Sequence, residues 1–155
     1  MDRLERLHGQ GKTRAIGVSN FDSTQIQALV DDAAIKPAIN QLGYGIGHPQ
    51  TQWMPASEIE PAVLKSKDLG VSVSAWGPLG RTTAQGVANV LGNPTLKSVA
   101  ERHGKSSAQV ALRWLVEQGV SVVTASNNAR HYHEDLEVTD FSLNEQDIRE
   151  LKDAF

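Results

Sequence analysis

The chain has 155 residues, of which 39% are hydrophobic and 21% are charged, as in a single soluble globular domain. Its formal net charge of -3 argues against a nucleic-acid or anionic-membrane partner, because both bind a concentrated basic face. It contains no cysteine, which excludes disulfides and thiolate chemistry, and no apolar run reaches the roughly 18 residues of a membrane span. The polar first residues lack the apolar stretch of a secretory signal, so we expect a cytoplasmic location.

The first part of the chain alternates amphipathic stretches with short apolar runs. Two leucines three residues apart predict a helix over residues 2–10, which glycines end. Apolar runs predict strands over residues 15–18 and 38–42. Between them, Asp22 or Ser23 is suited to cap the start of an amphipathic helix.

The middle of the chain begins with a glycine-rich stretch. Residues 43–55, GYGIGHPQTQWMP, predict a long loop, and loops of this length are often functional. A helix is predicted over residues 57–69, and a third strand over residues 71–75. Glycine and proline break the chain directly after that strand.

The next part of the chain carries the clearest helix signals. Asn93 before Pro94 predicts a helix start, because proline suits the first helical position. Ser106 with Gln109 predicts a capping box, in which each side chain satisfies a backbone donor of the first helical turn. The helix that it opens is strongly amphipathic, and a fourth strand is predicted over residues 120–123.

The C-terminal part predicts two further helices. Residues 126–135 indicate a loop that runs into a short helix, and Ser142 with Glu145 predicts a second capping box that opens the last helix. The histidines are scattered, and we expect His103 at the surface.

Strands separated by helices predict an α/β fold, because such strands build a parallel sheet with right-handed crossovers. No linker, repeat or low-complexity tract divides the chain, so we expect one domain over residues 1–155. Parallel sheets of this kind place their sites at the carboxyl ends of the strands, so the turns after the strands are the candidate sites.

Several of these segments together resemble the aldo-keto reductases. The resemblance rests on GKTRAIGVSNF (11–21), Asn40-Gln41, AWGPLG (75–80), KSSAQVALRWLVEQGVSVVTAS (105–126) and EDL (134–136). They occur in that family's order and at its approximate spacing, over essentially the whole chain. The resemblance implies an NADP-dependent oxidoreductase domain, with NADP(H) as the cofactor and NAD(H) as the alternative.

That family folds as an eight-unit TIM (β/α)8 barrel. The resemblance places this chain on strands 5–8, the C-terminal half of the barrel, and implies truncation on the N-terminal side. The family's catalytic tetrad of Asp, Tyr, Lys and His comes from the other half. Tyr44, Tyr132 and the five histidines do not match the tetrad motifs, so we expect no catalytic residue in this chain.

The resemblance implies that Ser19 and Asn20 hydrogen-bond the nicotinamide carboxamide, with Gln41 as a third contact. A hydroxyl and an amide suit a primary amide, because both groups donate and accept hydrogen bonds. A helix-capping turn is the alternative for Ser19 and Asn20, whose neighbours are rich in cap-forming residues. For Gln41 the alternative is a polar residue that closes a strand.

The turn after the third predicted strand is implied to contact the same cofactor. Trp76 stands where the family has an aromatic residue that stacks on the nicotinamide ring, with a packed core aromatic as the alternative. Gly77 replaces a frequent serine, whereas Leu79 and Gly80 keep a loop shape that lets backbone amides approach a phosphate.

The segment after the fourth predicted strand resembles the family's adenosine-phosphate clamp. Ala125 stands directly before Ser126, where the family usually has a lysine, and His131 stands where the family often has arginine. Both changes weaken a preference for NADPH over NADH unless Arg130 compensates. A solvated helix face is the alternative for this segment. The contacts implied here are Ser126, Asn127, Arg130, His131, Glu134 and Asp135.

Two functions remain open. One is the cofactor-binding half of an NAD(P)H-dependent aldo-keto reductase that is inactive alone; the other is a non-catalytic half-barrel that binds a nucleotide or a partner. Four parallel strands cannot close into a barrel, and their unpaired edges invite pairing with another chain. We therefore expect self-association or a complementary N-terminal half-barrel. We expect no metal site, since His131 and His133 do not share a helix face.

Overall fold

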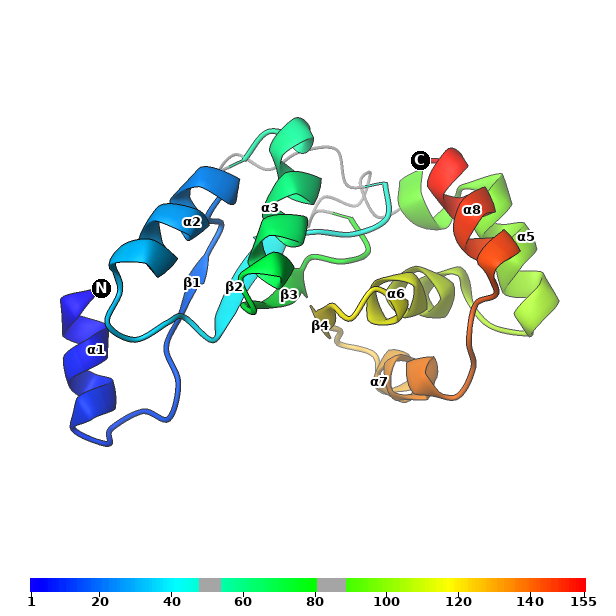
Figure 1. The fold of residues 1–155 in the computed structure, drawn as a ribbon. Helices are drawn as coiled ribbons and strands as arrows, with labels where there is room; N and C mark the ends of the chain where they lie inside the picture. The colour runs from blue at the N-terminus through cyan, green and yellow to red at the C-terminus, as the bar shows by residue number, and fades with distance from the viewer. Residues whose placement is uncertain (48–53, 81–88) are drawn as a thin grey trace. The chain divides into compact units, whose positions relative to one another are not determined.

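A computed structural model describes residues 1–47, 54–80 and 89–155 (Figure 1). It contains a four-stranded parallel sheet in the order β1-β2-β3-β4, with the bounds Gly17–Ser19, Ile39–Gly43, Ser72–Trp76 and Ser121–Val123. The four predicted strands are all present, and each begins one or two residues later than its apolar run. The predicted loop over residues 43–55 includes residues 48–53, which lie outside the described residues.

The chain forms two compact units. The first comprises Met1–Gly43 and Pro49–Ser74, and the second comprises Tyr44–His48 and Ala75–Phe155. The boundary therefore falls within β3. Among the described residues, no helix combines the length and the apolar character needed to cross a membrane.

In the first unit, β1 and β2 run parallel and set the register of the turn that follows β1. Gly17 lies opposite Ile39, and Ser19 lies opposite Gln41. A Cβ atom at Gly17 would lie 2.8 Å from the Ile39 carbonyl oxygen, so glycine allows the two strands to approach.

The helices of the first unit are α1 (Asp2–Gly9), α2 (Ser23–Asp32) and α3 (Ala56–Asp68). Asp22 caps α2, as predicted: its carboxylate accepts hydrogen bonds from the backbone N–H groups of Thr24 and Gln25. α2 and α3 pack against each other, and α2 buries Ile26 completely.

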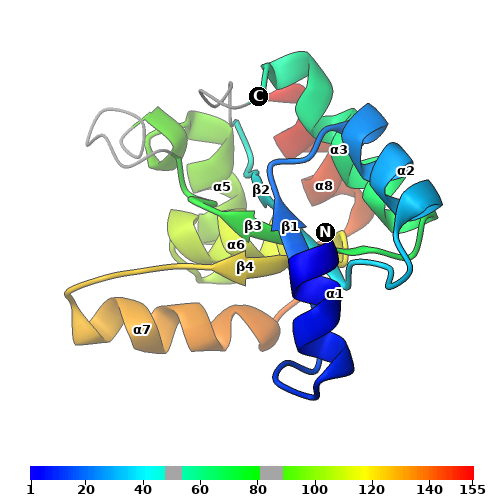
Figure 2. The same cartoon turned by 90° about the vertical axis from the view of Figure 1, so that its left-hand side faces the viewer.

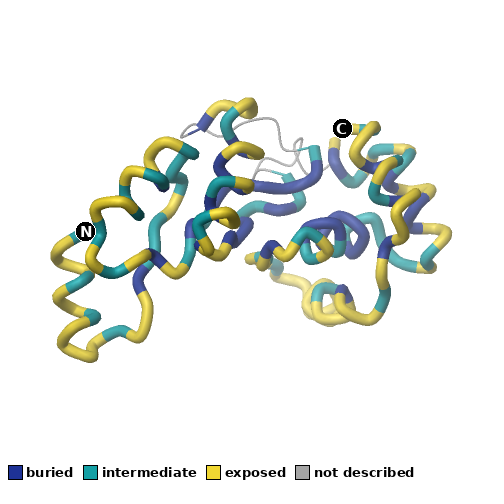
Figure 3. The backbone as a smooth tube through the Cα atoms, viewed as in Figure 1, coloured by how far each residue is buried: buried dark blue, intermediate teal, exposed yellow. Residues whose placement is uncertain are grey.

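The second unit includes the helices α5 (Pro94–His103), α6 (Ser107–Glu117), α7 (Ala129–Leu136) and α8 (Glu145–Asp153), with a short 3-10 helix, η1 (Glu137–Thr139), after α7. Figure 2 shows α6 beside β4, and α6 also packs against α5 and α7. α6 is largely buried whereas α7 is largely exposed (Figure 3), which makes α6 the centre of this unit's core.

The caps of α5 and α6 are those that the sequence predicts. The Asn93 side chain accepts hydrogen bonds from the first turn of α5, and Pro94 is the first helical residue. Ser106 and Gln109 form the predicted capping box of α6.

The predicted cap of the last helix is wrong. Asn144 caps α8 in place of Ser142, and its capping box includes Asp147 in place of Glu145. The local rule of Glu or Gln three residues after the cap fits Ser142 with Glu145 only. Asp147, however, is buried and also pairs with His103, whose Nε2 lies 2.8 Å from an Asp147 carboxylate oxygen. His103, which was expected at the surface, is therefore part of a polar contact with Asp147, and its side chain is 21% exposed.

Candidate functional site

The turn after β1 brings together three of the predicted site residues. Ser19 Oγ donates a hydrogen bond to the Gln41 carbonyl oxygen at 3.0 Å, and the Asn20 backbone N–H donates to the same oxygen at 2.9 Å. Gln41 lies within β2, two residues before its end, and not at the end of the strand as predicted. Asn20 has a φ of 58°, in the left-handed region that few residues with a side chain adopt.

Asn40 is a polar residue near this turn that we did not predict as part of the site. It is fully buried in β2, and its side chain bonds both backbone groups of Phe21: Nδ2 donates to the carbonyl oxygen at 2.9 Å and Oδ1 accepts from the N–H at 3.4 Å. The sequence signals it in two ways: Asn40 belongs to one of the motifs that carry the resemblance, and it is a polar residue in the interior of a short strand.

A pocket of about 730 Å³ lies in the second unit. Its walls are the turn after β3, the N-terminus of α6, the end of β4 and the exposed helix α7. It therefore collects segments that are far apart in the sequence. The predicted site residues that line it are Trp76, Leu79, Ser126, Arg130, His131, Glu134 and Asp135, whereas Asn127 is exposed and is not among its lining residues.

The backbone conformation of the turn after β3 favours glycine at two positions. Gly77 has a φ of 59° and Gly80 a φ of 104°, both in the left-handed region, so side chains at these positions would strain the backbone. Both glycines line the pocket, where the absence of a side chain leaves backbone atoms accessible to a ligand.

Hydrogen bonds hold the start of α7 in one arrangement. The Asn128 side chain caps the helix by accepting from the Arg130 backbone N–H at 3.0 Å. Ser126 Oγ lies 3.0 Å from His131 Nδ1, and the Tyr132 hydroxyl donates to the Ser126 carbonyl oxygen. The predicted residues Ser126 and His131 thus contact each other.

The charged groups of this pocket are already paired. Arg130 Nε lies 3.2 Å from a Glu134 carboxylate oxygen, one helical turn away. The Thr124 hydroxyl donates to Asp135 Oδ2 at 2.7 Å. Among the described lining residues, Arg130 is the only lysine or arginine. The pocket can therefore bind a moderately charged anion through backbone donors and Arg130, at the cost of competing with Glu134.

Gln109 fixes α7 against α6. Its Nε2 donates to the Glu134 carbonyl oxygen at 3.0 Å and to a Glu137 carboxylate oxygen at 3.2 Å, and it is buried. The sequence identified Gln109 as a capping residue only. The additional contacts join two walls of the pocket through one amide.

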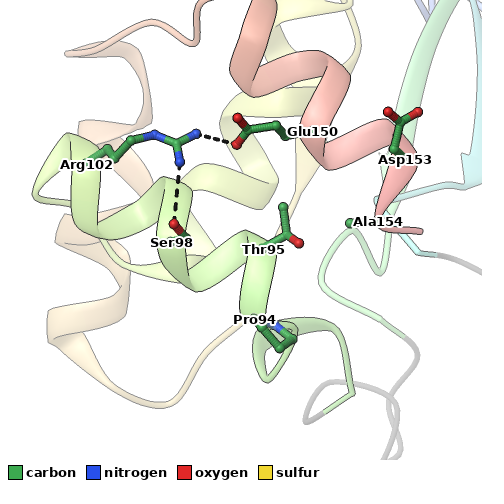
Figure 4. A pocket seen from close by; sticks show the side chains of 7 residues that line it. All are labelled: Pro94, Thr95, Ser98, Arg102, Glu150, Asp153 and Ala154. Carbon is green, nitrogen blue, oxygen red and sulfur yellow. Dashed lines mark hydrogen bonds and ion pairs between the residues drawn. The ribbon is translucent and has the colours of Figure 1, made fainter.

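A second hollow, of about 650 Å³, lies along α5 and α8 (Figure 4). Figure 4 shows the Arg102 guanidinium directed at Ser98 and Glu150, and Arg102 also lies 2.7 Å from Asp147 Oδ1. Arg102, the arginine of this hollow, thus pairs with carboxylates on α8. Among the described residues, no cluster of three or more His, Asp or Glu side chains could hold a metal ion.

Ser19 and Trp76 were expected to line one pocket. They belong to different units, and that expectation stays a prediction. The structure brings Ser19, Asn20 and Gln41 together in the first unit, and Trp76 together with the start of α7 in the second.

The sequence model of the aldo/keto reductase family matches residues 1–154. A D-galacturonate reductase from Fragaria ananassa is 36% identical over 151 residues, which cover 97% of this chain and 44% of the relative. A glyoxal reductase from Bacillus subtilis is 36% identical over 148 residues, which cover 96% of this chain and 48% of the relative. The chain spans about half the length of these curated relatives.

Solved structures show the same likeness. An aldose reductase from Schistosoma japonicum matches with a TM-score of 0.82 at 30% identity, over 98% of this chain and 45% of that one. A Bombyx mori aldo-keto reductase in complex with NADP matches with a TM-score of 0.80 at 30% identity, over 97% of this chain and 47% of that one. The α/β arrangement with parallel strands is thus that of part of a larger fold.

Proposed function

This chain belongs to the aldo/keto reductase family, and we propose that it is the cofactor-binding half of an NAD(P)H-dependent oxidoreductase of that family. A similar enzyme from Glycine max is described as an NAD(P)H-dependent 6'-deoxychalcone synthase, and a similar structure holds NADP. The single observation that carries the proposal is the pocket of the second unit, which gathers seven of the predicted contact residues from two separate segments.

In the first unit, Ser19, Asn20 and Gln41 are suited to the nicotinamide carboxamide. Ser19 donates its hydroxyl proton to the Gln41 carbonyl oxygen, so the lone pairs of Oγ remain to accept from an amide NH2 group. The Gln41 side-chain amide can both donate and accept. These groups bind and orient the end of the cofactor that carries the hydride.

In the second unit, the pocket is suited to an adenosine diphosphate. The N-termini of α6 and α7 line it, and the positive ends of helix dipoles attract phosphate. The Gly77–Gly80 turn lets backbone N–H groups approach the ligand. Trp76, which the resemblance assigns to stacking on the nicotinamide ring, also lines this pocket, and Arg130 offers a charge for a phosphate.

The dinucleotide, when bound, supplies or accepts a hydride, and this chain's residues hold it. Resemblance favours NADP(H), with NAD(H) as the alternative. We place no catalytic acid in residues 1–155, so chemistry is proposed to need groups outside this chain. A non-catalytic half-barrel that binds a nucleotide or a partner is the second candidate, and it is favoured by the absence of tetrad motifs in the sequence.

Binding and turnover separate these possibilities. We expect NADPH and NADH to quench tryptophan fluorescence of the 155-residue chain, with the quenching lost in Trp76→Leu and kept in Trp114→Phe, because Trp114 lies in the core of the second unit. We expect no aldehyde-dependent oxidation of NADPH by the chain alone, because general acid–base help is typically worth about 10²–10⁴-fold. Quenching that Trp76→Leu leaves intact would place the nucleotide elsewhere. Aldehyde reduction at a rate typical of intact enzymes would show that the chain contains its own catalytic groups.

A further inference from the structure

Asn40 joins the interior of β2 to the turn after β1. Its side chain is fully buried, and its Nδ2 donates to the Phe21 carbonyl oxygen at 2.9 Å and to Ser66 Oγ on α3 at 3.2 Å. The Ser66 hydroxyl in turn donates to the Ala62 carbonyl oxygen at 2.7 Å. Both hydrogens of the amide are thereby used, so the orientation of the Asn40 side chain is fixed.

Gln41, the next residue of β2, bonds the first residues of the same turn. The Gln41 carbonyl oxygen accepts from the Ser19 hydroxyl and from the Asn20 N–H, while Asn40 Oδ1 accepts from the Phe21 N–H. Two consecutive residues of one strand therefore fix three consecutive residues of the turn. Asn20, at the centre, has a φ of 58°, in the left-handed region that asparagine adopts more readily than other residues with a side chain.

We propose that Asn40 is a positioning residue for the nicotinamide end of the cofactor. By gripping both backbone groups of Phe21, it holds Asn20 in the left-handed conformation and so keeps the Ser19 and Asn20 side chains aimed at one carboxamide. The inference rests on the proposed function of the turn. Burying the Asn40 amide costs free energy that an apolar residue at this position of β2 would not. The hydrogen bonds to Phe21 offset that cost.

The unaltered chain offers a first test. The turn is only partly buried, so its backbone amides would exchange rapidly with solvent if nothing held them. If Asn40 grips the turn, hydrogen exchange at the Phe21 N–H is slowed by at least about a hundredfold relative to an unstructured chain. Exchange at the unstructured rate would overturn the proposal without any substitution.

Two substitutions test the role in binding. In Asn40→Asp, the size is kept but a carboxylate oxygen faces the Phe21 carbonyl oxygen and Ser66 Oγ, where an N–H group stood. We expect the affinity for nicotinamide mononucleotide to fall about tenfold, because the grip on Phe21 is lost. The affinity for ADP, which binds in the second unit, should stay within about twofold. Ser66→Ala is the matched control: it removes the other partner of the same amide but leaves both Phe21 contacts.

The outcomes are distinguishable. Selective loss of nicotinamide mononucleotide binding in Asn40→Asp, with Ser66→Ala close to the unaltered chain, supports the proposal. An equal loss in Ser66→Ala shows that general packing is responsible, and unchanged binding in a folded Asn40→Asp shows that the grip does not matter; either overturns it. If Asn40→Asp does not fold, the Phe21 exchange rate decides. If the unaltered chain binds ADP but not nicotinamide mononucleotide, the proposed carboxamide site is wrong, and so is this inference. If the unaltered chain binds neither ligand, the proposed function itself is wrong.

Discussion

At the level of single residues, the only arginine among the described lining residues of the second unit's pocket already has a carboxylate partner. Arg130 lies within 3.2 Å of Glu134, and Asp135 accepts a hydrogen bond from Thr124. NADP(H) differs from NAD(H) by one more phosphate, which needs a cation that is free to bind it. We therefore predict that the preference of the proposed cofactor site for NADP(H) or NAD(H) depends on how strongly Glu134 holds Arg130.

Releasing Arg130 should shift the preference toward the phosphorylated cofactor. In Glu134→Gln we expect the affinity for NADPH to rise about three- to tenfold, because one carboxylate is removed and the guanidinium loses its competitor. The affinity for NADH, which lacks the additional phosphate, should gain less than the affinity for NADPH, so the ratio of the two affinities is the quantity to compare. Isothermal titration calorimetry with both nucleotides measures the difference.

The matched control is Glu145→Gln. Glu145 pairs with Arg149 one turn away at 3.3 Å, in the same unit, but neither residue lines the pocket. Glu145→Gln removes the same charge as Glu134→Gln and should leave the affinities for NADPH and NADH unchanged. An equal gain for NADPH in both variants would mean that net charge alone is responsible, which contradicts a role for the Arg130–Glu134 pair.

At the level of elements, α8 illustrates how a tertiary contact overrides a local signal. The chain offers Ser142 with Glu145 and, two residues later, Asn144 with Asp147. The structure uses the second pair, because Asp147 also accepts from Arg102 Nη2 at 2.7 Å on α5. A cap that also anchors the helix to its neighbour stabilises more than one that only ends the helix.

Two cap substitutions test this assignment. We expect Asn144→Ala to lower the free energy of unfolding by about 1 kcal/mol, the usual cost of a lost helix cap. Ser142→Ala should change it by less than about 0.5 kcal/mol, as for other surface substitutions. Urea unfolding followed by far-ultraviolet circular dichroism gives both values. A larger loss of unfolding free energy in Ser142→Ala than in Asn144→Ala would show that Ser142 caps α8, as the sequence predicted.

The contact between α5 and α8 should also depend on pH. Burial by itself raises the pKa of Asp147, but hydrogen bonds from Arg102 and His103 outweigh it and hold the pKa below its ordinary value of 3.8. A carboxylate with a lower pKa in the folded state stabilises the fold above its unfolded pKa and loses that contribution as the pH falls through the folded pKa. We therefore expect the free energy of unfolding to fall as the pH is lowered from about 5 to about 2.

Asp147→Asn isolates this contribution, because it cannot ionise. The difference in unfolding free energy between the unaltered chain and Asp147→Asn should be largest near neutral pH and shrink as the pH falls below about 4. Urea titrations at several pH values measure it. A difference that is constant with pH would show that the ionised form of Asp147 does not matter to stability.

At the level of the whole molecule, the chain corresponds to about half of its relatives and presents open edges. Among the described strands, β1 and β4 each have one neighbour in the sheet. Val123 on β4 is 49% exposed, and Leu136 on α7 is 76% exposed. Unpaired strand edges and exposed apolar side chains both favour association with another chain.

We therefore predict that the 155-residue chain does not behave as a well-packed monomer. It should form a dimer in which edge strands of the two copies pair, or lack fixed packing, or aggregate. Size-exclusion chromatography with light scattering gives the mass, and near-ultraviolet circular dichroism reports on packing. A 16.8 kDa monomer with a sharp cooperative melt would contradict the prediction.

The sequence by itself determined the order of helices and strands, because their signals are local. The caps at Asn93 and Ser106 and the short apolar runs lie within a few residues of the elements that they start. The family followed from the same local segments, and the family match confirmed it. The gathering of Trp76, Ser126 and Arg130 around one pocket was anticipated only through the resemblance, since no local pattern relates residues that far apart.

Only the tertiary structure decided which polar groups hold one another. The Asn40 side chain bonds the backbone of Phe21, Glu134 pairs with Arg130, and Asp147 belongs to the capping box that starts α8. Each choice depends on a partner from another segment or another helical turn, at a distance and orientation that periodicity does not encode. A buried polar group must find a partner, but which partner it finds is set by how the strands and helices pack.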